Sequence, residues 1–282
     1  MEQIQNNRVI TDLYRENAQF PGIALDGSDV YLCWQRFVDR HDSLMASCRR
    51  GDEVVWEREI SDGGEVLHPV ILAHGGAIWY AWSEYARENW RILARCYRDG
   101  QWGEVLTVAS GEALFFPRLF TWQGRLHVIW TEQHKGSAAA VLCPLTEAGP
   151  GAAETVSAVG EAYRAGAAEG GDGNLYVAYD GFDGKQYKLF ARARTAAGWS
   201  KEIVVSQGED WASTPWIAAK PDGAVVGWYD YGYMAVYSVR SADLTVRDGA
   251  LAAVNPQCLK EGVDWYLDLH VASNASGLQA MA

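Results

Sequence analysis

The sequence lacks the features that define several large classes of protein. No apolar run approaches about eighteen residues, so no membrane-spanning helix is expected. Asp and Glu (36) outnumber Lys and Arg (24), and the net charge of −12 disfavours nucleic acid and anionic membrane surfaces as partners. The five cysteines show no CxxC spacing and four lie in expected strands, so we interpret them as free thiols that behave as small hydrophobic residues. No segment has the apolar stripe at i, i+3, i+4 and i+7 that predicts an amphipathic helix.

The first residues also lack the pattern of a secretory leader. MEQIQNNRVI has neither the basic region nor the apolar region of a signal peptide. We therefore expect a cytoplasmic location for the chain as it stands, and a secreted one only if a leader preceded it.

Short apolar runs separated by Gly, Asp and Asn take the place of helical patterns. Between His68 and Trp102, three such runs end in turns and a fourth begins at Gln101. Apolar runs of four to eight residues bounded by turn residues are typical of β-strands. This stretch therefore predicts one antiparallel unit of four strands.

The same unit recurs along the chain. A Pro precedes a Trp by 13 residues in four places: Pro21 and Trp34, Pro69 and Trp82, Pro117 and Trp130, Pro215 and Trp228. A degenerate copy lies at 164–179, and residues 208–228 align without a gap on 262–282. A period of about 40–50 residues with four strands per copy is typical of a β-propeller.

We expect an all-β fold, with residues 1–282 forming a single β-propeller of six four-stranded blades. The approximate blade bounds are 18–60, 66–108, 114–158, 162–206, 212–255 and 264–282. The sixth copy stops before its third strand, and residues 8–12 match a fourth strand, so this N-terminal strand is expected to close the ring. Unpaired strands favour association, and we expect a partner chain or a C-terminal segment beyond Ala282 to complete the sixth blade.

The expected turns between third and fourth strands resemble Asp boxes. ARCYRDGQW (94–102), ARARTAAGW (191–199) and ASCRRGDEVVW (46–56) keep the Gly and Trp of the pattern Ser-x-Asp-x-Gly-x-x-Trp. On these motifs the chain resembles the degenerate BNR (Asp-box) repeat propellers of the sialidase-like superfamily. The resemblance implies the fold, because the box residues are structural in that superfamily. It also implies an arginine clamp for a carboxylate. The arginines available on the expected face are Arg15, Arg36, Arg40, Arg87, Arg118 and Arg164.

Loop lengths predict which end of the propeller binds ligands. The loops from fourth to first strands and from second to third strands gather at one end of the channel and are long, polar and aromatic. The opposite end has short turns such as DGS, HGG and PDG. Functional residues concentrate in such loops on a rigid scaffold, so the loop-rich end is the expected binding face.

Four acidic residues on that face are the candidate catalytic residues. Each lies two positions after the blade Trp or its equivalent: Glu84, Glu132, Asp180 and Asp230. If the blades superpose, these carboxylates ring the channel mouth and could act as acid, base or nucleophile in glycoside hydrolysis. No cofactor is expected, although the same carboxylates could hold Ca²⁺ at the channel mouth. The alternative is that each carboxylate caps a strand end and faces solvent or an arginine.

A second group combines cationic and aromatic side chains and is expected to bind a ligand. Its members are Arg36, His68, Trp90, Arg118, His134, Arg164, Trp211, Tyr229, Tyr231 and Trp265. Guanidinium groups recognise carboxylates, and flat rings offer apolar surface to the C–H faces of a sugar. A His with a Tyr could also act as acid and base in a polysaccharide lyase. The alternative for the aromatic residues is packing between blades.

Three functions remain open at this stage. A module that binds a carbohydrate or another small polar ligand is preferred, because no catalytic motif is complete. The first alternative is a glycoside hydrolase or polysaccharide lyase that uses the clustered carboxylates. The second is a protein-interaction or assembly scaffold, completed at its last blade by another chain.

Overall fold

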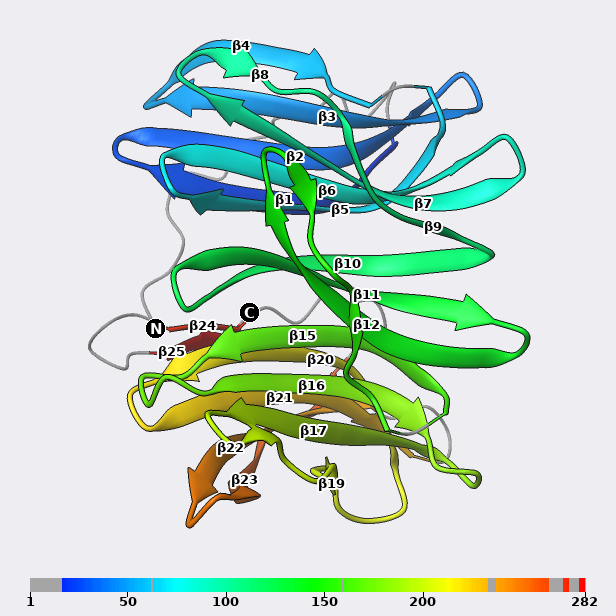
Figure 1. The fold of residues 1–282 in the computed structure, drawn as a ribbon, viewed down its shortest axis with the longest axis vertical. Coiled ribbons are helices and arrows are strands. Elements are labelled where there is room, and N and C mark those ends of the chain that lie inside the picture. Colours follow the sequence, from blue (N-terminus) through cyan, green and yellow to red (C-terminus); the bar gives the residue numbers. More distant parts are fainter. Residues whose placement is uncertain are drawn as a thin grey trace.

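The computed structural model describes residues 17–61, 63–158, 160–232, 237–263, 271–273 and 279–281. Every regular element in these residues is a β-strand, and each sheet is antiparallel (Figure 1). This part of the chain contains no helix long and apolar enough to cross a membrane. The all-β fold expected from the short apolar runs is confirmed.

The strands form consecutive sheets, which we call blades 1 to 5. Blade 1 contains β1 (Asn17–Asp26), β2 (Asp29–Val38), β3 (His41–Arg50) and β4 (Glu53–Glu59). Blade 2 contains β5 (Glu65–His74), β6 (Ala77–Ala86), β7 (Asn89–Arg98), β8 (Gln101–Trp102) and β9 (Leu106–Gly111). Blade 3 contains β10 (Ala113–Trp122), β11 (Arg125–His134), β12 (Ser137–Thr146), β13 (Gly149–Pro150) and β14 (Glu154–Thr155).

The next two blades follow the same plan. Blade 4 contains β15 (Ala162–Glu169), β16 (Leu175–Phe182), β17 (Tyr187–Thr195), β18 (Gly198–Trp199) and β19 (Ile203–Val204). Blade 5 contains β20 (Trp211–Lys220), β21 (Gly223–Tyr231), β22 (Tyr237–Arg247) and β23 (Ala250–Val263). In blades 2 to 4 the outermost strand is split into two short pieces that both pair with the third strand.

The first strand of each blade is the innermost one. β1, β5, β10, β15 and β20 lie side by side in chain order, and the other strands of each blade extend outward from them (Figure 1). β24 (Val271–Ser273) lies beside β20 and pairs with β25 (Gln279–Met281), so these strands begin the sixth blade. The chain is therefore a β-propeller. The strand expected at 8–12 lies outside the described residues.

Aromatic and aliphatic side chains fill the space between neighbouring blades. One cluster joins Tyr31 and Leu44 of blade 1 to Tyr80 and Trp82 of blade 2. A large aromatic side chain removes about 150–250 Å² from water, so Trp82, Trp130 and Trp228, which are almost fully buried, supply much of the packing of their blades. This packing explains the regular spacing of tryptophans in the sequence.

Tryptophans also cover the outer edges of the blades. Trp102 directly follows the turn after β7, and its ring lies 5.4 Å from the ring of Trp56 in blade 1. The guanidinium carbon of Arg95 lies 5.2 Å from the Trp102 ring, and Arg192 is placed in the same way on Trp199 at 5.3 Å. Such cation–π contacts add about 0.5–1 kcal/mol each at partly exposed sites.

Candidate functional site

Each inner strand contains a β-bulge near the loop-rich end. The pairing of first and second strands shifts register at the equivalent place in all five blades. The residue at each shift has a positive φ: Phe20 (50°), His68 (52°), Phe116 (54°), Arg164 (22°) and Thr214 (55°). We call these five the bulge residues. A non-glycine residue in this region is strained by about 1–3 kcal/mol, and such strain concentrates at functional sites.

The recurring prolines help to keep this geometry. A proline follows every bulge residue except Arg164. Proline disfavours the right-handed helical conformation in the residue before it, and it has no N–H to pair with the neighbouring strand. The Pro that marked the repeats in the sequence therefore marks the position where each inner strand bulges.

All five bulge residues line one cavity of about 430 Å³ between the inner strands. We call it the channel-mouth cavity. Its wall also includes residues two positions after the bulge, among them Arg118 and Trp216, and apolar side chains such as Ile71 and Leu119. A cavity of this size is within the usual range of about 300–1,000 Å³ for small-molecule sites.

One side of the channel-mouth cavity is aromatic. The imidazole of His68 lies between the rings of Phe20 and Phe116, at centroid distances of 5.0 and 4.2 Å. Burial lowers the pKa of His68 to about 4, and the positive charges of Arg118 and Arg164 act in the same direction. His68 is therefore neutral at pH 7. Its Nδ1 is buried and has no hydrogen-bond partner among the described residues.

The other side is polar and cationic. Arg164 donates through Nε to Oδ1 of Asp180 at 3.3 Å, forms an ion pair through Nη2 with Oδ2, and donates through Nη1 to Oγ1 of Thr214 at 3.3 Å. The backbone N–H of Thr214 donates to Oδ2 of Asp180 at 3.4 Å. The guanidinium of Arg118 lies over the Trp216 ring, 4.2 Å from its centroid. Two guanidinium groups thus face the cavity from different blades.

Asp180 lies behind this side of the cavity and is fully buried. Burial raises the pKa of Asp180, while the Arg164 guanidinium and the Thr214 N–H oppose that shift. Of the four candidate carboxylates, Asp180 contacts two residues of the channel-mouth cavity, Arg164 and Thr214. None of the four is among the residues described as lining it.

Two of the other carboxylates are buried within their own blades. Glu84 accepts a hydrogen bond from Trp82 Nε1 at 3.3 Å and pairs with Arg91. Asp230 accepts from Trp228 Nε1 at 2.6 Å and lies 3.3 Å from Nε of Arg240, while burial raises its pKa. Both belong to the second strand of a blade, which is one strand away from the channel. This matches the alternative in which each acid faces an arginine.

Glu132 is half-buried and lies in a different hollow. With His134 it lines a cavity of about 410 Å³ on blade 3. His134 is exposed, and its Nδ1 lies 2.9 Å from Oε2 of Glu112. The four carboxylates are thus not gathered around one cavity. Among the described residues, no group of three or more His, Cys, Asp or Glu side chains is placed to hold a metal ion.

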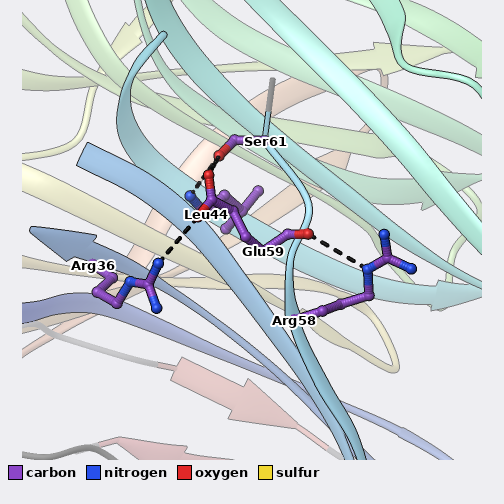
Figure 2. A network of polar contacts seen from close by, with 5 residues as sticks. All are labelled: Arg36, Leu44, Arg58, Glu59 and Ser61. Atoms are coloured by element: carbon purple, nitrogen blue, oxygen red, sulfur yellow. Dashed lines mark hydrogen bonds and ion pairs between the residues drawn. The ribbon is translucent and has the colours of Figure 1, made fainter. Parts of the chain in front are cut away.

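Arg36 is paired away from the channel-mouth cavity. Its Nη2 donates to Oε2 of Glu59 at 3.0 Å, and Oε1 of Glu59 accepts from the Ser61 hydroxyl at 3.5 Å (Figure 2). The same hydroxyl accepts the backbone N–H of Leu44 at 3.0 Å. This network joins the second, third and fourth strands of blade 1, and Arg36 is not among the residues that line the channel-mouth cavity.

The predicted aromatic residues have different surroundings. Tyr229 is 8% exposed and belongs to the core of blade 5. Trp90 packs edge-on against Phe115, with ring centroids 4.6 Å apart. Trp211 is 41% exposed and lies 5.7 Å from the ring of Tyr231. Trp265 lies outside the described residues.

Sequence reasoning placed His68, Arg118 and Arg164 in the ligand-binding group, and the structure brings these three to one cavity. Phe20 and Phe116 belong to the aromatic residues expected on the same face, with packing around the channel as the alternative, and both line this cavity. Sequence reasoning did not include Thr214 and Trp216, which line it as well. The signal that could have identified them is their position, because each lies immediately before a repeat proline or directly after it.

Comparison with known proteins identifies the fold. No family model matches the chain, and no curated protein sequence matches it. A Hadza microbial sialidase has a TM-score of 0.57 at 14% identity, with 90% of this chain and 61% of that chain covered. A puromycin-hydrolyzing peptidase from Mycobacterium tuberculosis has a TM-score of 0.57 at 16% identity, with 88% and 37% covered. The alpha-L-arabinofuranosidase from Lactobacillus brevis has a TM-score of 0.50 at 10% identity, with 95% and 94% covered.

Identities this low show a shared fold and leave the chemistry to be argued from the site. The chain spans about two thirds or less of the sialidase and the peptidase, and nearly all of the arabinofuranosidase. With its antiparallel blades and its inner strands in sequence order, the chain has a β-propeller fold that resembles the fold of these structures.

Proposed function

We propose that this propeller binds a carbohydrate, or another small polar ligand, in the channel-mouth cavity. The observation that supports this most strongly is the lining of the cavity. Two guanidinium groups, Arg118 and Arg164, face a wall formed by Phe20, His68 and Phe116. Apolar walls with a few convergent polar groups are typical of small-molecule sites.

Each part of the lining matches one part of a sugar. The aromatic wall can contact the C–H face of a sugar ring, which is apolar. The arginines can donate hydrogen bonds to hydroxyl groups, and to a carboxylate with higher strength because the bonds are charge-assisted. The neutral imidazole of His68, which lines the cavity, can form a hydrogen bond with a hydroxyl group, because one of its nitrogens is a donor and the other an acceptor. A sugar that bears a carboxylate would use all of these groups.

Glycoside hydrolysis is the second candidate function. It is supported by the fold that the chain shares with a sialidase and an arabinofuranosidase. It is also supported by Asp180, because a carboxyl with a raised pKa beside a cavity can act as a general acid. A glycosidase needs two carboxyl groups about 5–10 Å apart at the scissile bond. The described lining of the cavity contains no carboxylate, so binding is preferred. A lyase would instead use the neutral His68 as base.

A glycan array with purified protein tests the proposal, followed by aryl-glycoside hydrolysis assays on the sugars that bind. We expect binding to a defined class of sugars, a loss of about tenfold or more in Arg118→Met, and no loss in Arg98→Met. Arg98 is the matched control, since it pairs with Glu147 and lies at the end with short turns. Absence of binding to every sugar class, together with absence of hydrolysis, would contradict both candidates.

Two further parts of the proposal concern the blades themselves. We propose that the turns before Trp102 and Trp199 are degenerate Asp boxes, supported by their place between the third strand and the outer strand. We also propose that a partner chain completes the sixth blade. Analytical ultracentrifugation of the 282-residue chain tests this, because an uncompleted strand row favours self-association.

A further inference from the structure

The loop-rich face has a second feature, a row of aromatic side chains over blades 4 and 5. Its members are Tyr163, Phe182, Tyr187, Trp211, Tyr231 and Tyr237, and we call them the aromatic row. Ring centroids are 5.5 Å apart from Phe182 to Tyr187, 5.3 Å from Tyr187 to Trp211, 5.7 Å from Trp211 to Tyr231, and 5.3 Å from Tyr231 to Tyr237. Tyr163 joins the row 6.0 Å from Tyr187. All but Tyr163 are the first or last residue of a strand, so the row follows the rim of two blades.

Packing between the two blades does not account for the whole row. Blades 4 and 5 are held together by a buried cluster that includes Tyr176, Leu189, Val226 and Trp228. Trp211 is not part of that cluster and is 41% exposed. The flanking rings of Tyr187 and Tyr231 are tilted by 50° and 56° to the Trp211 ring, so the row offers an exposed apolar ring with tyrosine hydroxyl groups beside it.

The aromatic row adjoins the channel-mouth cavity along two inner strands. Tyr163 directly precedes Arg164 on β15, and Trp211 lies three residues before Thr214 on β20. Arg164 and Thr214 both line the cavity. A molecule that leaves the cavity along the starts of these two strands therefore meets Tyr163 and Trp211.

We propose that the aromatic row is a second sugar-binding surface, and that the ligand is an oligosaccharide with one unit in the channel-mouth cavity and the following units on Trp211 and its neighbours. This inference rests on the proposed function. It adds that the site selects by chain length as well as by the chemistry of one sugar unit. The rings supply apolar contact to each successive unit, and the tyrosine hydroxyls supply hydrogen bonds along the same path.

Isothermal titration with two length series tests this inference. The probes are oligogalacturonates and arabino-oligosaccharides of one to six units, titrated into the wild-type protein and into Trp211→Ala. We expect affinity to rise with length in the wild type. Trp211→Ala should weaken binding of the longest oligomers about three- to tenfold and leave the shortest binders unchanged, because only longer chains reach the row.

Phe37→Ala is the matched control. Phe37 is 44% exposed and lies near the end of β2 in blade 1. The substitution therefore removes a ring of similar exposure from another blade. Tyr187→Ala is a second test variant, and the melting temperature of each protein shows whether it is folded. Equal affinity for all lengths, or an equal loss for all lengths in Trp211→Ala, would overturn the inference and leave the proposed function standing. No binding at any length in either series would count against both.

Discussion

Replacing Arg164 with methionine should destabilise the protein in a pH-dependent way. The side chain of Asp180 is fully buried, while that of Arg164 is 35% exposed. Arg164→Met keeps the length of the side chain and removes the charge that compensates the buried carboxylate. The carboxylate would remain in an apolar environment with the Thr214 N–H as a remaining donor.

The size of the effect follows from the burial of the pair. Breaking a fully buried ion pair costs about 3–5 kcal/mol, because one charge is left uncompensated. Solvent reaches about a third of Arg164 and screens the pair, so we expect a loss of about 2–3 kcal/mol in the free energy of unfolding at pH 7.

The pH dependence has a definite sign. Burial holds the pKa of Asp180 above its ordinary value of 3.8, and Arg164 opposes that shift. Removing Arg164 raises the folded-state pKa further. A carboxyl group whose pKa is higher in the folded state than in the unfolded state stabilises the folded protein at low pH. This contribution is lost as the pH rises through the pKa of the folded state. The difference in the free energy of unfolding between wild type and Arg164→Met should therefore be small at pH 4 and grow toward pH 7.

Urea unfolding followed by tryptophan fluorescence at pH 4 and pH 7 measures this difference. The double variant Arg164→Met/Asp180→Asn should recover most of the loss at pH 7, since it removes the uncompensated charge. An equal loss at both pH values, or no recovery in the double variant, would refute the account of the buried pair.

Three other predictions concern neighbouring features. The pKa of His68 is about 4 in the folded protein against an ordinary 6.5, so stability should fall as pH decreases from about 6.5 through about 4. In His68→Phe this fall in the free energy of unfolding should be smaller by about 2–3 kcal/mol, as measured by urea unfolding at each pH. Gly223→Ala should lower the melting temperature more than Gly249→Ala, because its Cβ would lie 2.1 Å from the Leu244 carbonyl oxygen while that of Gly249 meets nothing within 4 Å. Iodoacetamide at pH 8 should modify one thiol of the native protein, that of Cys258. The other four cysteines are buried, and burial raises the pKa of Cys33 to about 12. Rapid labelling of all five thiols would contradict that burial.

The fold could be predicted because one spacing recurs. The Pro and Trp that lie 13 residues apart mark the bulge of the inner strand and the core of the second strand, which are both fixed by packing. The split outer strands of blades 2 to 4 could not be predicted, since short pieces such as β8 and β9 depend on pairing with β7 and show little pattern of their own.

The candidate site was predicted in part. The arginines and His68 were found through their place on the loop-rich face. The placement of the acids depended on strand register, which sequence does not give. Glu84 lies directly opposite Arg91 in the β6–β7 hairpin, so an ion pair forms within the blade. The equivalent Glu132 lies opposite Ala139 and is left half-buried. The cross-strand neighbour thus distinguishes the surroundings of Glu84 from those of Glu132.

A crystal structure of the protein with a bound sugar tests the central claim most directly. The account predicts one sugar unit in the channel-mouth cavity, with its ring against Phe20 or Phe116 and its polar groups within hydrogen-bond distance of Arg118 and Arg164. Sugar bound instead at the opposite end, for example in the cavity of about 660 Å³ beside Trp79 and Arg98, would contradict it.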